Sequence, residues 1–486
     1  MRLGDLLIES GLVTQDQITS ALETQSRLGG RIGDNLVRNG ALTQSALDAF
    51  LHRIPAEPAN LAATRIDSSE LLSLLLRIIY VDHLETVRQF VEAIKLPYSL
   101  VHDLVQMAVE RKRLYTLGTR ESPNPLDMRY VFTEEGRRWV MDTLNQTRYT
   151  GPAPVTLEEF VRQVLLQKTT NELITFERIK EASKHLTFET RLIEQAGPAL
   201  NSGRAMLLYG PPGNGKTSVA LSFASVFTDP IYIPHAVLVE GQIIRVYDSS
   251  LHKPVQVKAA NPEAAFTLMR GEEHDARWVA CERPFVVVGG ELTLEMLDLR
   301  YDPAANYYEA PLHVKALGGC FLIDDFGRQL VSPTNLLNRW IVPLENRIDY
   351  LKLHTGKTFS VPFEALVIFS TNLEPEDLMD PAFLRRLPYK IEVGGPPLPL
   401  YKQIFTRESE KQGLQISDEA FDIIVHKLTR EKGLQLAAYQ PRFIIDQVVA
   451  TCKFMGQQPH FEPRFIDYAL NNLRVHRQPP SASPAT

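Results

Sequence analysis

The segment from Gly210 to Ser218, GPPGNGKTS, has the residue types and the spacing of a loop that holds phosphates. Its glycines let the backbone fold around phosphate groups with the N–H groups pointing inward. In this pattern Lys216 reaches the β- and γ-phosphates of a nucleotide, and the hydroxyl of Thr217 binds Mg²⁺. The pattern therefore predicts a nucleotide site made by Gly210, Pro211, Pro212, Gly213, Asn214, Gly215, Lys216, Thr217 and Ser218.

Polar side chains at the ends of two later apolar runs would complete this site. The run GCFLIDDFG contains Asp324, which suits the Mg²⁺ shell, and Asp325, which suits orienting or deprotonating the attacking water. The run ALVIFSTN ends in Asn372, a neutral polar side chain suited to holding that water. The acidic run alone is weak evidence for such a site, but behind a phosphate-binding loop it is strong.

Three arginines further along the chain are candidates for contacts with the nucleotide. Arg385 and Arg386 stand just before the apolar segment PYKIEV, where a pair of arginines fits a solvated face equally well. Arg442 begins a late helical segment, YQPRFIIDQVV.

Short apolar runs, bounded by turn residues and alternating with helical segments, must position these side chains. The runs are AMLLYG, IYIPHAVLV, FVVVGG, GCFLIDDF and ALVIFSTN, and all follow Val155. This alternation is typical of an α/β domain with a buried parallel sheet. After Gly394 the sequence is helical again and ends with EPRFIDYALNNL.

The order of these motifs closely resembles the AAA+ ATPases over residues 157–475. The resemblance implies ATP and Mg²⁺ as cofactors and a ring, expected to be a hexamer, because an arginine finger acts on the nucleotide of a neighbouring subunit. It also implies a pre-sensor-1 hairpin at DYLKLHTGKTFSVPF. The implied roles are Walker A for Lys216 and Thr217, Walker B for Asp324 and Asp325, sensor 1 for Asn372, arginine finger for Arg386 or Arg385, and sensor 2 for Arg442.

Two features depart from that family. Asp325 stands where the family usually has Glu, so its carboxylate is one methylene further back, and we expect slow turnover or a bridging water. A strand-rich insert, at about residues 228–315, lies between the loop and the acidic run and includes QIIRVYDSSLHKPVQVK. Tyr307 and Tyr308 in this insert are candidates for gripping a substrate, although ordinary packing is the favoured interpretation.

The chain opens with a repeat. Residues 2–25, RLGDLLIESGLVTQDQITSALETQ, return at residues 31–54 as RIGDNLVRNGALTQSALDAFLHRI, with 8 of the 24 positions identical. A doubled unit predicts two similar helical hairpins, and a small bundle with glycine caps is one interpretation. However, the arginine that heads each copy could bind the O6/N7 edge of guanine and stack on a base. Two such half-sites suit a ligand with two guanines, with Leu7 and Leu36 among the aliphatic walls.

This repeat resembles the MshEN domain, the N-terminal cyclic di-GMP-binding domain of type II secretion and type IV pilus ATPases. The first copy departs from the motif at Ile18 alone, and the second copy departs at Ile32, Ala41 and Ile54. The resemblance implies cyclic di-GMP as a regulatory ligand, with weakened affinity through the second copy. The alternative is a scaffold kept for protein contacts. The implied ligand residues are Arg2, Leu3, Gly4, Leu7, Ile8, Gly11, Leu12, Gln25, Arg31, Ile32, Gly33, Leu36, Val37 and Gly40.

Between two breaks rich in Pro, Ala and Thr, at residues 53–68 and 148–156, lies a segment that resembles a winged helix. Helical periodicity covers 70–81, 84–94 and 98–112, followed by the short strands LYTLG and MRYVFT and a helix capped by Thr133. DNA binding and protein contact are the two interpretations. The third helix offers only ERKR at its C-terminal end, which favours protein contact.

Bulk properties set the remaining expectations. A net charge of −6 and a pI near 6.1 give no electrostatic case for nucleic acid or an anionic membrane. Three widely spaced cysteines suit a reducing cytosol, and the chain shows no signal peptide. The apolar run at residues 71–81 is too short to span a membrane and carries Arg77. We therefore expect a cytoplasmic bacterial protein without membrane insertion.

The sequence thus predicts a multidomain chain: a small all-α repeat domain, a winged-helix-like α+β domain, an α/β P-loop AAA+ core with its insert, and an all-α lid. Its expected function is a cyclic di-GMP-responsive ATPase ring that remodels or drives a protein partner. A link to pili, secretion or surface polysaccharide follows by association only. The alternative is an ATP-controlled, DNA-binding regulator. The expected ranges are 1–56, 69–150, 157–395, 396–475 and a disordered tail at 476–486.

Overall fold

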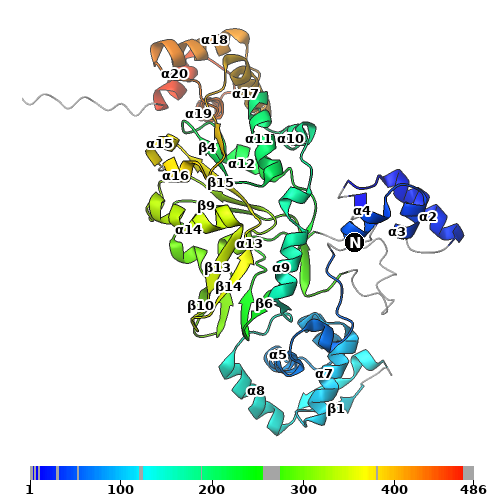
Figure 1. The fold of residues 1–486 in the computed structure, drawn as a ribbon. Helices are drawn as coiled ribbons and strands as arrows, with labels where there is room; N and C mark the ends of the chain where they lie inside the picture. The colour runs from blue at the N-terminus through cyan, green and yellow to red at the C-terminus, as the bar shows by residue number, and fades with distance from the viewer. Residues whose placement is uncertain are drawn as a thin grey trace, which may run out of the picture. The chain divides into compact units, whose positions relative to one another are not determined.

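The computed structural model is shown in Figure 1. Its described residues form two compact units, Met1–Leu173, Phe227–Leu322 and Gln329–Val367 in the first and Ile174–Val226, Ile323–Arg328 and Ile368–Thr486 in the second. None of the described helices is long and apolar enough to cross a membrane. Arg2, Leu3, Arg31 and the tail 476–486 lie outside the described residues. The described residues are 4, 7–8, 11–28, 32–51, 54–119, 124–187, 189–255, 274–378 and 381–473.

The N-terminal repeat of the first unit is helical in its described residues. Its helices are α2 (Gln15–Leu28), α3 (Ile32–Arg38) and α4 (Gln44–Leu51). The buried core takes one residue from each copy at the same 29-residue spacing, in the pairs Leu7 and Leu36, Val13 and Leu42, Ile18 and Leu47, and Ala21 and Phe50. The sequence repeat is therefore also a repeat of packing.

The glycine turns of the two copies match bond for bond. Gly11 has a φ of 69° and Gly40 a φ of 70°, in the left-handed region that glycine adopts at little cost. The N–H of Gly11 donates to the carbonyl of Ile8 at 2.9 Å, and the N–H of Gly40 donates to the carbonyl of Val37 at 3.0 Å. The predicted glycine-capped helical hairpins are confirmed.

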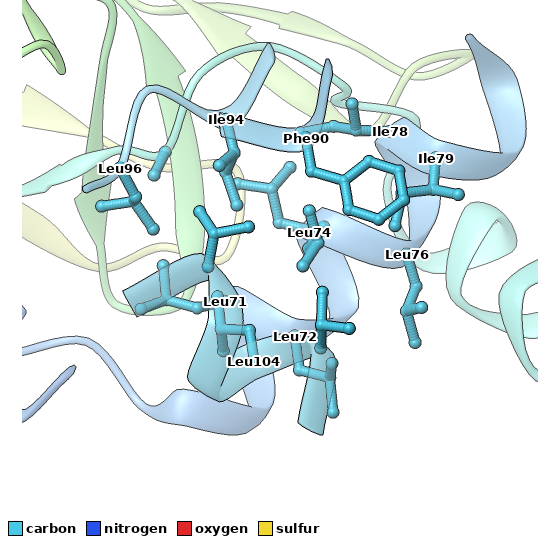
Figure 2. Close-up of a cluster of buried hydrophobic side chains, with 14 of the residues drawn as sticks. Leu71, Leu72, Leu74, Leu76, Ile78, Ile79, Phe90, Ile94, Leu96 and Leu104 are labelled. Atoms are coloured by element: carbon cyan, nitrogen blue, oxygen red, sulfur yellow. The ribbon is translucent and has the colours of Figure 1, made fainter. Parts of the chain in front are cut away.

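The next part of the first unit contains the elements predicted for residues 69–150. They are α5 (Ser68–Val81), α6 (Val87–Ile94), α7 (Tyr98–Glu110), β1 (Leu114–Gly118), β2 (Arg129–Phe132) and α8 (Glu134–Gln146). β1 and β2 pair antiparallel, and the Thr133 side chain caps α8 by accepting from Gly136 N–H at 2.9 Å. Leucines and isoleucines of α5 pack with Phe90, Ile94 and Leu104 in a buried hydrophobic core (Figure 2). Its resemblance to a winged helix stays a prediction.

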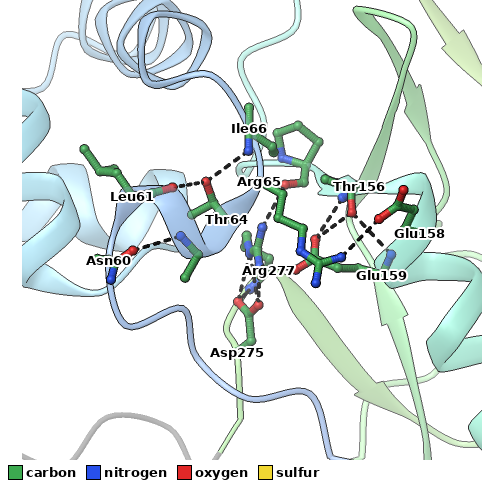
Figure 3. A network of polar contacts seen from close by, with 12 residues as sticks. Asn60, Leu61, Thr64, Arg65, Ile66, Thr156, Glu158, Glu159, Asp275 and Arg277 are labelled. Carbon is green, nitrogen blue, oxygen red and sulfur yellow. Dashed lines mark hydrogen bonds and ion pairs between the residues drawn. The ribbon is translucent and has the colours of Figure 1, made fainter.

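The two breaks predicted as linkers or boundaries are packed segments. In the first, the N–H of Asp275 donates to the carbonyl of Pro55, and Thr64 is fully buried. Nearby, the buried guanidinium of Arg277 binds both carboxylate oxygens of Asp275 and lies beside Glu159 (Figure 3). In the second break, Tyr149 is buried. Its hydroxyl donates to the carbonyl of Pro152, and its own carbonyl accepts from Nε of Arg77. Within the first break Pro58, Thr64 and Ile66 are buried and Leu61–Thr64 forms a short 3-10 helix, while many of the other described residues are exposed.

The rest of the first unit is mostly strand. Helix α9 shares one buried core with two sheets and a hairpin. The sheets have the orders β10-β11-β7-β6-β3 and β5-β8, and the hairpin is β13-β14. The run IYIPHAVLV is two strands rather than one, and among the described residues of QIIRVYDSSLHKPVQVK only the first four form a strand. The elements are β3 (Val155–Thr156), α9 (Leu157–Leu166), β5 (Ile231–Pro234), β6 (Ala236–Val239), β7 (Gln242–Arg245), β8 (Trp278–Cys281), β9 (Phe285–Val288), β10 (Arg300–Asp302), β11 (Tyr307–Glu309), α13 (Leu312–Lys315), β12 (Cys320–Ile323), α14 (Pro333–Asn346), β13 (Ile348–Lys352) and β14 (Thr358–Pro362).

Tyr307 and Tyr308 make packing contacts in β11. Tyr308 is buried and lies against the rings of Tyr301 and His354. Tyr307 contacts Tyr149 edge-on, with ring centroids 5.7 Å apart. The favoured packing interpretation is confirmed for Tyr308.

The second unit contains the loop predicted to bind phosphates and the C-terminal helices. Its elements are α10 (Phe176–Ala182), α11 (Thr190–Ser202), β4 (Met206–Tyr209), α12 (Lys216–Ala224), β15 (Leu366–Thr371, from Ile368 in this unit), α15 (Pro375–Leu378), α16 (Pro381–Leu384), β16 (Tyr389–Glu392), α17 (Leu398–Lys411), α18 (Asp418–His426), α19 (Gln440–Phe454) and α20 (Pro463–Asn472). In this unit β4 lies between β16 and β15 and pairs parallel with both. The helices after β16 enclose a separate core.

Candidate nucleotide site

The carboxyl ends of neighbouring strands bring the predicted residues together. Thr371, the last residue of β15, is the register partner of Tyr209, the last residue of β4. The phosphate-binding loop follows Tyr209, and Asn372 follows Thr371, so the two begin at the same edge of the sheet. Parallel α/β sheets bind their ligands at this edge.

Lys216, Asn372 and Asp325 form one hydrogen-bonded chain. The ammonium of Lys216 donates to the Asn372 side-chain oxygen at 2.6 Å and to the carbonyls of Gly210 and Pro211 at 2.9 and 3.0 Å. The Asn372 side-chain nitrogen donates to Asp325 Oδ1 at 2.9 Å. The predicted amide therefore lies between the predicted lysine and the predicted carboxylate.

Thr217 and Asp324 form a second contact at the same edge. The Thr217 hydroxyl donates to Asp324 Oδ2 at 2.7 Å. Hydroxyl and carboxylate oxygens are hard ligands of the kind Mg²⁺ prefers, and Mg²⁺ commonly keeps waters and phosphate oxygens as its other ligands. The described residues contain no group of three or more His, Cys, Asp or Glu that could hold a metal by themselves. The pair therefore fits an ion that is shared with a phosphate.

Local backbone geometry exposes these groups to a ligand. Gly215 caps α12 with a φ of 80°, and the helix begins at Lys216, so the positive end of its dipole lies at the loop. Asp325 has a φ of 48°, a left-handed conformation that Asp tolerates better than most residues. Burial lowers the pKa of Lys216 from its ordinary value, while the carboxylates of Asp325 and Asp324 act in the opposite direction.

A pocket of about 950 Å³ opens over this edge. Its walls include the loop, both aspartates, Asn372 and the start of α19 with Arg442. The Arg442 side chain is 77% exposed, and its Nε lies 3.7 Å from Asp446. The size is at the upper end of the range for ligand sites and suits a whole nucleotide.

Two of the predicted arginines lie elsewhere. Arg385 and Arg386 follow α16, where their N–H groups donate to the carbonyls of Pro381 and Phe383. Neither is among the residues that line the pocket.

The structure buries two of the side chains predicted to wall a purine. Leu7 and Leu36 are completely buried in the domain's own core, and their contact with a ligand stays a prediction. They pack the two hairpins together, which is what an inward-facing position at matching spacing does. Ile8 and Val37 are half-buried, and Leu12 is 38% exposed.

Sequence reasoning missed a second, smaller pocket of about 210 Å³ that shares residues with the first. Aliphatic side chains from three helices line it: Leu192 of α11, Val219 of α12, and Leu400 and Ile404 of α17. Such walls suit a flat base. No local motif marks them, because only tertiary packing brings the three helices together. The larger pocket also has unpredicted cationic residues, namely Arg328, Arg407 and Lys411.

Comparison with known sequences gives partial matches. A family model described as a domain of unknown function, DUF8689, matches residues 398–472. The RuvB subunit of the Holliday junction branch migration complex from Thermomicrobium roseum is 34% identical over 77 residues, 16% of this chain and 20% of that protein. The type IV pilus assembly ATPase PilB from Myxococcus xanthus is 41% identical over 58 residues, 12% of this chain and 10% of that protein. The matches thus span a fifth or less of these relatives.

Similar solved structures are distant. NtrX from Brucella abortus has 14% identity and a TM-score of 0.36, over 66% of this chain and 63% of that one. A RuvB variant from Thermotoga maritima has 15% identity and a TM-score of 0.33, over 63% and 73%. TM-scores this low do not identify a shared fold.

Proposed function

We propose that the protein is a Mg²⁺-dependent ATPase of the AAA+ type that hydrolyses ATP to ADP and phosphate. The observation that carries the proposal is the hydrogen-bonded set Lys216–Asn372–Asp325 beside Thr217–Asp324. Its members come from a loop and two strand ends far apart in the sequence, yet they meet where a terminal phosphate would lie. A chance glycine loop has no reason to gather them.

Each residue then has a distinct task. The loop N–H groups and the N-terminus of α12 hold the phosphates, and Lys216 neutralises their charge. Thr217 and Asp324 would hold Mg²⁺, which neutralises charge on the β- and γ-phosphates when bound. Asp325 orients the attacking water and accepts its proton, while Asn372 fixes the Asp325 carboxylate. The short Asp side chain makes turnover slow.

We further propose a homo-oligomeric ring in which Arg386 or Arg385 completes the site of the neighbouring subunit. The position of both arginines outside the pocket of their own chain supports this assignment. The exposed guanidinium of Arg442, at the start of α19, would contact the phosphates of its own subunit.

For the N-terminal domain we propose cyclic di-GMP binding that regulates the ATPase. The matched turns and the paired core support a two-fold site for a two-fold ligand. Similarity to a type IV pilus assembly ATPase, the class whose N-terminal domain the repeat resembles, also supports it. In this proposal Arg2, Arg31 and Gln25 supply the polar contacts with the ligand, and the glycines and aliphatic residues of the two copies supply the apolar ones.

The rival function, DNA binding through residues 69–150, receives no support from α7. This helix contains no Lys or Arg, and its exposed residues include Asp103 and Glu110. Arg111, Lys112 and Arg113 follow it, and the guanidinium of Arg113 lies over the ring of Trp139. A DNA-reading helix needs cations near the phosphates, so we assign this segment to protein contact and propose a protein partner for the motor.

Equilibrium binding of a fluorescent ATP analogue with Mg²⁺ tests the proposed function. Lys216→Ala should lose binding because the phosphates lose their buried cation. Lys180→Ala, which removes an exposed lysine of α10, is the matched control and should bind like the unaltered protein. Equal binding by all three proteins would show that Lys216 and its loop do not hold the nucleotide.

A further inference from the structure

The phosphate-binding loop is hydrogen-bonded to the residues that lead into α19. The N–H of Ala438 donates to the Asn214 side-chain oxygen at 3.1 Å, and the N–H of Tyr439 donates to the carbonyl of Gly213 at 2.9 Å. The Asn214 side-chain nitrogen turns back to the carbonyl of Pro211 at 3.4 Å. One buried amide side chain thus joins two backbone segments that are 224 residues apart.

Close packing accompanies these bonds. A Cβ placed on Gly213 would lie 2.3 Å from Cδ1 of Tyr439, so the aromatic ring sits directly on the loop backbone. Gly213 has a φ of 80°, which already favours glycine. The loop therefore cannot change its path at this point without displacing the ring that immediately precedes α19.

The hydrogen bond between Asn214 and Ala438 lies between the two pockets that a nucleotide would fill. Asn214 and Ala438 line the larger pocket and also the smaller one. Arg442 is four residues beyond Ala438, in the first turn of α19. Four positions along the chain therefore separate the backbone that the loop binds, at Ala438, from the guanidinium of Arg442.

We propose that Asn214 is a positioning residue that couples occupancy of the phosphate-binding loop to the placement of α19 and Arg442. The inference rests on the proposed ATPase function. The pattern of the loop allows any residue at this position, so the role belongs to this chain's own asparagine. Nucleotide that enters the loop then tightens the 436–446 segment through the Asn214 amide.

Hydrogen exchange of the full-length protein, with and without Mg²⁺ and ATP, tests this coupling. In the unaltered protein, ATP should slow exchange in both the loop and residues 436–446. In Asn214→Ala, the loop should stay protected while the slowing at 436–446 falls at least about fivefold, the order expected for losing a bridging hydrogen bond. In a steady-state assay the same variant should lower kcat at least about fivefold and change KM less than about threefold.

Two further variants sharpen the result. Asn214→Asp keeps the oxygen that accepts from Ala438 and should retain the protection at 436–446, even where its charge weakens ATP binding. Asn145→Ala, an exposed asparagine of α8, should behave like the unaltered protein. Full ATP protection of 436–446 in Asn214→Ala would overturn the coupling. Absence of any ATP protection in the unaltered protein would instead reject the proposed function.

Discussion

At the scale of single residues, Asp325 is a departure from the pattern of the AAA+ ATPases that the motifs resemble. Its carboxylate accepts from Asn372 and occupies a left-handed backbone position at the edge of the pocket. The side chain should therefore act in catalysis rather than in binding.

Asp325→Asn should bind ATP like the unaltered protein and hydrolyse it at least about a hundredfold more slowly, because the water loses the group that accepts its proton. Parallel measurements of ATP affinity and phosphate release check this. Asp325→Glu is the matched control and should hydrolyse at least as fast as the unaltered protein. Unchanged hydrolysis in Asp325→Asn would assign the catalytic acid to another carboxylate.

At the scale of elements, the two N-terminal hairpins should respond alike to the same change. Gly11→Ala and Gly40→Ala each force a side chain into a φ near 70°, with nothing within 4 Å to clash. The cost is therefore purely that of the backbone, about 1 kcal/mol. Hydrogen exchange in α2 and α4 should accelerate about fivefold for each variant, with Gln15→Ala as control. A silent Gly40 variant beside an active Gly11 variant would mean that the copies are not equivalent.

The N-terminal repeat should bind cyclic di-GMP through its two arginines, Arg2 and Arg31. Arg2→Ala and Arg31→Ala should each weaken binding roughly ten- to a hundredfold, the value of about 1–3 kcal/mol for a bidentate guanine contact. Gln25→Ala should weaken binding more than Ile54→Ala, because Ile54 packs against the hairpin core instead. Calorimetry on the full-length protein checks this, and the absence of heat with high micromolar ligand would leave the repeat as a docking module.

The elements also show how far sequence reasoning reaches. Strands β4, β12 and β15 and helix α12 were predictable, since each is a short apolar run joined to a local motif. The sequence also placed Lys216, Asp324 and Asn372 in one site. What it missed depends on tertiary contacts: the burial of Thr64 and Ile66, the small pocket lined by α11, α12 and α17, and the bridge from Asn214 to Ala438. No periodicity or motif encodes which distant backbone N–H a side chain will bond.

At the scale of the whole molecule, the ring proposal predicts cooperative assembly. If Arg386 completes a neighbour's site, specific ATPase activity should rise as protein concentration increases. Mixing equal amounts of Arg386→Ala and Lys216→Ala subunits, each expected to be inactive alone, should restore activity, because a Lys216→Ala subunit can still donate its arginine to the intact site of an Arg386→Ala neighbour. Arg385→Ala run alongside identifies which arginine acts. A monomer with full specific activity at low concentration would contradict the ring.

The central claim, that this chain hydrolyses ATP at the loop from Gly210 to Ser218, is tested most directly by phosphate release from ATP. The unaltered protein should release phosphate only when Mg²⁺ is present, and chelation should stop it. Lys216→Ala should release none above background, while Lys180→Ala should retain full activity. Release that persists in Lys216→Ala, or that ignores Mg²⁺, would contradict the account.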